Sequence, residues 1–297
     1  MSSYHNPTSY RAVAGAARRS SLATWAVTAI VTVGMVAATG IGAARAAPLF
    51  TLDPSKVSGI TGVAFTGDSL TVNDFSTVKF TGPGPGTSVA FTESGYLPIV
   101  SVSNGVNAVS TPGLKTDYSL YFFFQGSGTQ DSANVVGQNT SGSFTALSIK
   151  LFIANGPATF GFDANNDPVV LNAPISTLLA TGGLQAGGDN FVATRPSNTG
   201  ARFVPSAGVT TTLLPEASQA AFFVSPNPFY STEMSTFINL PNQITPLFTG
   251  NAVSGFQINA AGGGVSNFVA VAVPEPASML LLGAGLVCVG YMRRRAA

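Results

Sequence analysis

Three residue types that often carry chemistry in proteins are almost missing from this 297-residue sequence. Histidine, cysteine and tryptophan each occur once, as His5, Cys288 and Trp25, and all three lie toward the ends of the chain. The long middle region therefore lacks the residues for a Ser-His-Asp or Cys-His catalytic site, a His- or Cys-based zinc site, or an internal disulfide. Sugar stacking there would have to use Tyr or Phe.

Charged residues are also scarce and make up only 8% of the sequence. Residues 47–273 contain six Lys and Arg against eleven Asp and Glu, so this middle region has a net charge of −5. An acidic region argues against nucleic-acid binding, which needs a basic surface. The many Gly, Ser, Thr, Asn and Pro residues favour strands and turns over long helices.

The N-terminal segment has the parts of a signal peptide. Arg18 and Arg19 precede an apolar run, and the small residues Ala44 and Ala46 then stand before Ala47. This order predicts that residues 1–46 are an N-terminal signal helix and cleavage segment, cut between Ala46 and Ala47. We expect the general secretory route, with the twin-arginine route as the alternative because two arginines stand together.

The C-terminal segment, residues 268–297, has a second targeting pattern. Pro274, Glu275 and Pro276 precede residues 277–292, which contain no charge, and Arg293, Arg294 and Arg295 follow. As a helix, residues 277–292 would reach about 24 Å, just enough to anchor in a hydrocarbon core of about 30 Å. The arginines favour the cytoplasmic side, which leaves the rest of the chain outside the inner membrane. The two prolines keep their segment extended and open to a processing enzyme.

At these residues the chain resembles the PEP-CTERM sorting tail. The resemblance implies that an exosortase recognises Pro274, Glu275 and Pro276 and cleaves near them, in bacteria that make exopolysaccharide. The protein would then be anchored in the inner membrane only transiently. The alternative is an uncleaved C-terminal membrane anchor.

Residues 47–267 are predicted to form one all-β ectodomain, an antiparallel β-sandwich of jelly-roll type. Short apolar runs alternate with turn residues every 8 to 12 positions, as in sandwiches. Residues 144–153 place Leu and Ile on one face, which we expect in the core. Residues 118–124 are apolar on both faces, so this strand should be covered on both sides or shielded by a loop. We expect a loop over residues 126–142 and a partly flexible spacer over residues 250–264.

The acids of the middle region offer two candidate sites. A pair of carboxylates could hydrolyse a glycosidic bond, but none of the eleven acids stands out, so we expect no enzyme activity. Asp163, Asn165 and Asp167 carry alternate oxygen side chains like the start of a calcium loop. Pro168 and Pro174 stand where an EF-hand needs Gly and Glu, so we expect a polar turn without cofactor, with a calcium site as the alternative.

Four segments carry a second resemblance: residues 50–55, 64–70, 118–129 and 226–230. In these the ectodomain resembles the flocculation-associated branch of PEP-CTERM proteins. The resemblance implies a structural or adhesive protein of the cell surface or exopolysaccharide matrix that supports flocculation or biofilm formation. The alternatives are a lectin-like glycan-binding module, with calcium at Asp163, Asn165 and Asp167, and a polysaccharide-modifying enzyme.

Overall fold

The computed structural model describes residues 48–81, 88–131, 140–187, 190–196, 203–238, 244–250, 252–259 and 263–269. The signal segment with Ala44, Ala46 and Ala47 and the sorting segment from Pro274 to Arg295 lie outside the described residues. The described part consists of β-strands and two short 3-10 helices, which confirms the all-β prediction. None of its helices is long and apolar enough to cross a membrane.

The strands of the first half are β1 (Phe50–Leu52), β2 (Phe65–Gly67), β3 (Ser69–Val72), β4 (Phe75–Thr81), β5 (Val89–Asn104), β6 (Asn107–Val109), β7 (Tyr118–Gln130), β8 (Thr140–Asn155), β9 (Phe160–Phe162) and β10 (Pro168–Val170). Those of the second half are β11 (Ser176–Gly183), β12 (Asn190–Pro196), β13 (Phe203–Thr212), β14 (Leu214–Pro215), β15 (Phe223–Ser225), β16 (Thr232–Ile238), β17 (Ile244–Thr249), β18 (Ala252–Asn259) and β19 (Gly264–Val269). The 3-10 helices are η1 (Pro54–Lys56) and η2 (Ala217–Phe222).

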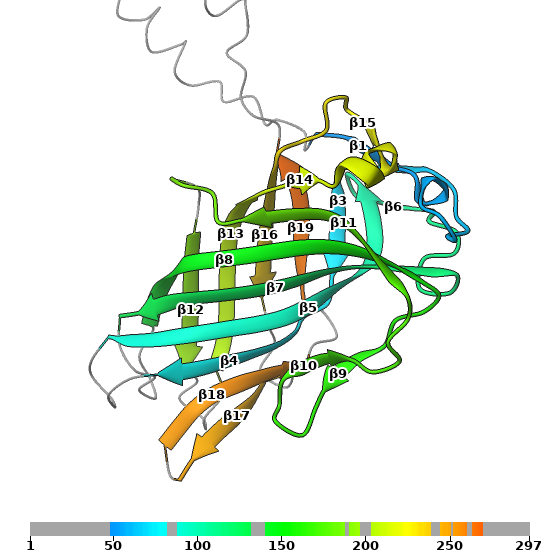
Figure 1. Cartoon of the computed structure of the whole chain (residues 1–297). Helices are drawn as coiled ribbons and strands as arrows, with labels where there is room; N and C mark the ends of the chain where they lie inside the picture. Colours follow the sequence, from blue (N-terminus) through cyan, green and yellow to red (C-terminus); the bar gives the residue numbers. More distant parts are fainter. Residues whose placement is uncertain are drawn as a thin grey trace, which may run out of the picture. The chain divides into compact units, whose positions relative to one another are not determined.

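Most strands belong to one antiparallel sheet of 14 strands. Strands β8, β12, β13, β16, β19, β3, β5 and β7 pair in that order, and β7 pairs with β8 again, so the pairings close a circuit. Figure 1 shows β8, β7, β5 and β4 crossing in front of β13, β16 and β19, which run at a steep angle behind them. The sheet therefore forms two facing layers around a core, as a sandwich-like fold requires.

Strand β8 shows how the sequence sets the two faces of the sheet. Ile149, Leu151 and Ile153 are buried, whereas Ser148 and Lys150 between them are exposed. Successive side chains of a strand point to opposite faces, so this alternation puts every second residue in the core. The predicted core face of this strand is confirmed.

Strand β7 is apolar on both faces because both faces are covered. Leu120 and Phe122 are buried in the main core. On the other face, the ring of Tyr121 lies 5.2 Å from the ring of Phe160 in the small β9–β10 sheet, and Tyr96 packs against both. The hairpin of β9 and β10 is thus the predicted shield.

Two glycine-rich segments were predicted wrongly in the parts that the structure describes, which exclude residues 132–139, 251 and 260–262. In residues 126–142, β7 continues to Gln130 and β8 begins at Thr140, because glycine is needed there for close packing. A Cβ on Gly128 would lie 2.5 Å from the Phe91 ring. Within residues 250–264, Ala252–Asn259 forms β18 between β17 and β4 rather than a spacer, because Phe256 and Ile258 are buried against the core side.

Candidate functional site

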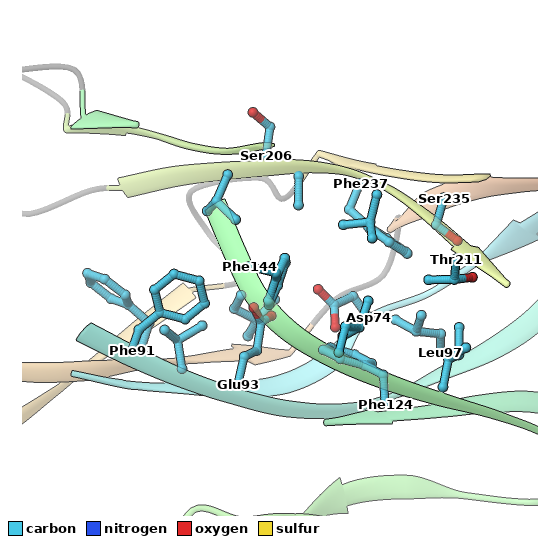
Figure 2. A pocket seen from close by; sticks show the side chains of 18 of the residues that line it. Asp74, Phe91, Glu93, Leu97, Phe124, Phe144, Ser206, Thr211, Ser235 and Phe237 are labelled. Atoms are coloured by element: carbon cyan, nitrogen blue, oxygen red, sulfur yellow. The ribbon is translucent and has the colours of Figure 1, made fainter. Parts of the chain in front are cut away.

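A cavity lies between the two layers of the sheet. Strands β4, β5, β7, β8 and β18 line one side, and β12, β13 and β16 line the other. The space open to the centres of water-sized molecules is about 70 Å³, which is room for about five waters. Figure 2 shows side chains of both layers pointing into this space.

The walls of the cavity are mostly apolar and rich in aromatic rings. Six phenylalanines line it: Phe80, Phe91, Phe124, Phe144, Phe237 and Phe256. The rings of Phe91 and Phe144 pack edge to face with their centroids 5.3 Å apart. Such walls repel water from any polar group that shares the cavity with them.

Three carboxyl groups, those of Asp74, Glu93 and Glu233, line this apolar space. Strand alternation places Glu93 and Glu233 there, and Asp74 lies in the link between β3 and β4. Glu93 shares its face of β5 with Phe91 and Leu97, and Asp74 continues the buried face that Leu70 and Val72 begin on β3. Figure 2 shows the side chains of Asp74 and Glu93 pointing into the space between the layers.

Burial changes the acid–base behaviour of Glu93. Loss of hydration and, after it, the charge of Asp74 raise its pKa, a hydrogen bond with Ser76 lowers it, and the net result is a rise from 4.5 to about 8. Glu93 is half-buried, and it lines both this cavity and a second, more polar recess beside β4. At neutral pH it is therefore mainly protonated and can both donate and accept hydrogen bonds.

Glu233 is fully buried and is held by three hydroxyl groups. Thr211 donates to one carboxylate oxygen at 2.8 Å, Ser266 donates to the other at 2.6 Å, and Ser235 also donates to the latter. Burial raises the pKa of Glu233, and the three hydrogen bonds lower it in part. The hydroxyls come from β13, β16 and β19, so this carboxyl group links three adjacent strands.

The cavity acids were not predicted from the sequence, although the pattern around Glu93 indicates a buried carboxyl group. Val89, Phe91, Gly95 and Leu97 alternate with polar residues in the sequence, and Glu93 falls on their face. An acid on an apolar strand face indicates a buried carboxyl group. Glu233 gave no such signal because its neighbours on the same face include Ser235.

The predicted candidates Asp163, Asn165 and Asp167 lie in the turn between β9 and β10, away from the cavity lining. The carboxylate of Asp163 accepts hydrogen bonds from the backbone N–H groups of Asn165 at 2.8 Å and of Asp167 at 2.9 Å. Asp167 forms an ion pair with Lys79, and Thr77 donates to the carbonyl of Asn166. These contacts make a polar turn, as expected.

No three Asp, Glu, His or Cys side chains within the described ranges lie close enough to hold a metal ion. The calcium alternative at this turn remains a prediction that a titration with calcium can test.

The turn also borders a polar recess on the outer face of the sheet. The recess is lined by Thr77, Lys79, Thr92, Glu93, Ser94, Gln125 and Gly126.

One comparison with known proteins concerns the export and processing of the chain. Residues 272–295 match the PEP-CTERM protein-sorting motif. The motif contains Pro274, Glu275, Pro276 and the three arginines, so the predicted sorting tail is confirmed. This motif implies that the protein is exported and processed by an exosortase.

No curated protein and no solved structure matches the chain. The sorting motif therefore describes how the protein is delivered and says nothing of its ectodomain. The resemblance to flocculation-associated PEP-CTERM proteins remains a prediction.

Proposed function

We propose that the processed ectodomain is a non-enzymatic structural or adhesive protein of the cell surface or exopolysaccharide matrix, where it supports flocculation or biofilm formation. The observation that carries this proposal is the sorting motif at residues 272–295, because an exosortase delivers its substrates to the outside of the cell. The resemblance of the ectodomain to flocculation-associated proteins points in the same direction.

The outer face of the sheet supports an adhesive role. The recess beside the β9–β10 turn presents the hydroxyls of Thr92 and Ser94 and the amide of Gln125, next to the charged Lys79 and Glu93. Neutral groups of this kind form hydrogen bonds with sugar hydroxyls at little desolvation cost compared with charged groups. Many weak contacts of this type add up when several copies bind one polymer.

The position of the acids supports a role without catalysis. A glycoside hydrolase needs its two carboxyl groups on either side of a sugar bond. Asp74, Glu93 and Glu233 instead surround a space with room for about five waters, which is smaller than one sugar ring. A polysaccharide chain would not fit between them.

The second candidate function is that of a lectin-like module that binds one particular glycan in the outer recess. It is favoured by the recess itself, which joins hydroxyl, amide and amine groups next to the Asp163–Asp167 turn. Titration of the released protein with exopolysaccharide fragments tests it. Saturable binding that Gln125→Ala weakens at least fivefold supports the lectin hypothesis. Loss of binding on adding a chelator would indicate that calcium takes part in binding.

The leading proposal is tested in cells that lack the protein. Complementation with the native chain should restore floc formation and place a processed species in the matrix. The double variant Pro274→Ala/Pro276→Ala should leave the full-length protein in the membrane and fail to restore flocs. Normal flocculation without the protein would refute the adhesive role, whatever the location of the variant.

The intact mass of the native protein in each cell fraction gives an independent check. A species that begins near Ala47 and ends near Pro274 in the matrix agrees with the proposal. A species that keeps residues 277–297 in the inner membrane contradicts it.

A further inference from the structure

We propose that the cavity between the two sheet layers binds a short-chain alkylammonium ion, with the ammonium group at Asp74 and Glu93 and the alkyl group among the phenylalanines. This inference goes beyond the proposed delivery and adhesive role, because it concerns the interior of the fold and not its destination.

The charges that line the cavity favour a cation. Asp74, Glu93 and Glu233 contribute carboxyl groups, and none of the described lining residues is Lys, Arg or His. The carboxylate oxygens of Glu233 already accept hydrogen bonds from Thr211, Ser235 and Ser266. Asp74 and Glu93 oppose each other's ionisation, so positive charge is favoured beside this pair, where carboxylate oxygens can accept hydrogen bonds from an ammonium group.

The walls favour a cation that also carries an apolar group. The faces of aromatic rings attract cations, most strongly where water is excluded. The six phenylalanines and their aliphatic neighbours offer no hydrogen bonds to most of the hydration shell of an inorganic ion. An alkyl chain can pack against these apolar walls, and its ammonium group can form hydrogen bonds with the carboxylates.

The size of the cavity limits the length of this ligand. A space for about five waters accepts a molecule of about five non-hydrogen atoms, such as butylammonium. The cavity is partly open to solvent, so such a small molecule can enter without unfolding the sheet. Rings with several substituents and whole sugars are too large.

The acid–base behaviour of Glu93 adds a signature that a neutral ligand cannot produce. With its pKa near 8, Glu93 is mainly protonated in the empty cavity at pH 6.5 and mainly ionised at pH 8.5. A bound ammonium ion favours the ionised form and displaces the proton. Affinity for the cation should therefore rise with pH, whereas affinity for a neutral analogue should not.

The experiment compares butylammonium with butan-1-ol, which has the same number of non-hydrogen atoms and no charge. Both are titrated by calorimetry into the protein in the form that cells release, at pH 6.5 and pH 8.5. We expect butylammonium to bind at least tenfold more tightly than butan-1-ol at pH 8.5, and about tenfold more weakly at pH 6.5 than at pH 8.5. This comparison needs no variant and so does not depend on how a mutant folds.

Two variants locate the site. Glu93→Gln should remove most of the preference for the cation and leave butan-1-ol binding unchanged, whereas Ala207→Leu should fill the cavity and abolish both. Glu216→Gln is the matched control, because Glu216 lies outside the cavity and its side chain makes no capping hydrogen bond. Equal affinity for the two probes, no binding of butylammonium, or a preference that survives in Glu93→Gln would overturn the proposal. None of these results bears on sorting or adhesion.

Discussion

Replacing Glu93 by glutamine should stabilise the protein at alkaline pH and leave its stability unchanged at acidic pH. Glutamine has nearly the shape of a protonated glutamate but cannot ionise. The pKa of Glu93 is about 8 in the fold against 4.5 for the unfolded chain. Between these values the folded protein keeps a proton that the unfolded chain has released, so the free energy of unfolding falls as pH rises from about 4.5 to 8.

The size of the effect follows from the same two values. One pKa unit corresponds to about 1.4 kcal/mol, so ionising Glu93 in the fold costs at most about 5 kcal/mol. Glu93 is half-buried rather than fully buried, and contact with solvent reduces this cost. We therefore expect Glu93→Gln to be about 2–3 kcal/mol more stable than the native protein at pH 9, or about 5–10 °C in Tm.

The assay is thermal unfolding followed by circular dichroism at pH 5, 7 and 9 for the native protein, Glu93→Gln and the control Glu216→Gln. The pKa of Glu233 is also raised, but Glu233 is present in all three proteins and cancels in the differences. The Tm of Glu93→Gln should exceed that of the native protein by a margin that grows from pH 5 to pH 9. A constant margin, or a loss of stability at pH 9, would show that Glu93 is not ionised against a desolvation cost.

Four further substitutions test the packing of the sheet and the hydrogen bonds of the β9–β10 turn. Phe122→Ala should lower the free energy of unfolding by about 3–5 kcal/mol in a urea titration, because Phe122 is fully buried, whereas Phe248→Ala on the exposed surface should change it by less than about 1 kcal/mol. Gly128→Val should cost about 1–3 kcal/mol in the same titration, because the strands and the Phe91 ring leave no room for a Cβ. Asp163→Ala should lower stability by about 1 kcal/mol through loss of two hydrogen bonds to the turn, and an increase in native Tm on adding calcium would revive the metal site there.

The sequence was informative wherever one strand could be interpreted by itself. The alternation of residues 144–153 predicted their buried face, and the apolar stretch of residues 118–124 predicted cover on both sides. Both predictions depend only on side chains within one strand and their two-residue period. The sorting tail was equally readable, because its motif is contiguous in the chain.

Features that depend on which strands meet were not readable from the sequence. Gly128 looked like a loop residue, although the packing of Phe91 from another strand explains it better. The cavity arises because Glu93 on β5, Glu233 on β16 and Asp74 in the link between β3 and β4 are brought around one space by the closed circuit. Local sequence patterns predict which face of a strand is buried, but they do not predict which residues of other strands pack against that face.

The closed circuit of strand pairing also bears on the order in which an exported chain can fold. Strand β3, near the beginning of the ectodomain, pairs with β19, the last described strand, and β4 pairs with β18. The sheet cannot close until Val269 has crossed the inner membrane, and only four residues separate Val269 from Pro274. A fully extended chain spans at most about 3.6 Å per residue, so the last strand is held within about 20 Å of the cleavage motif. With the tail anchored in the membrane as the sorting motif implies, the ectodomain would complete its fold beside the membrane, and exosortase cleavage would then release a finished domain.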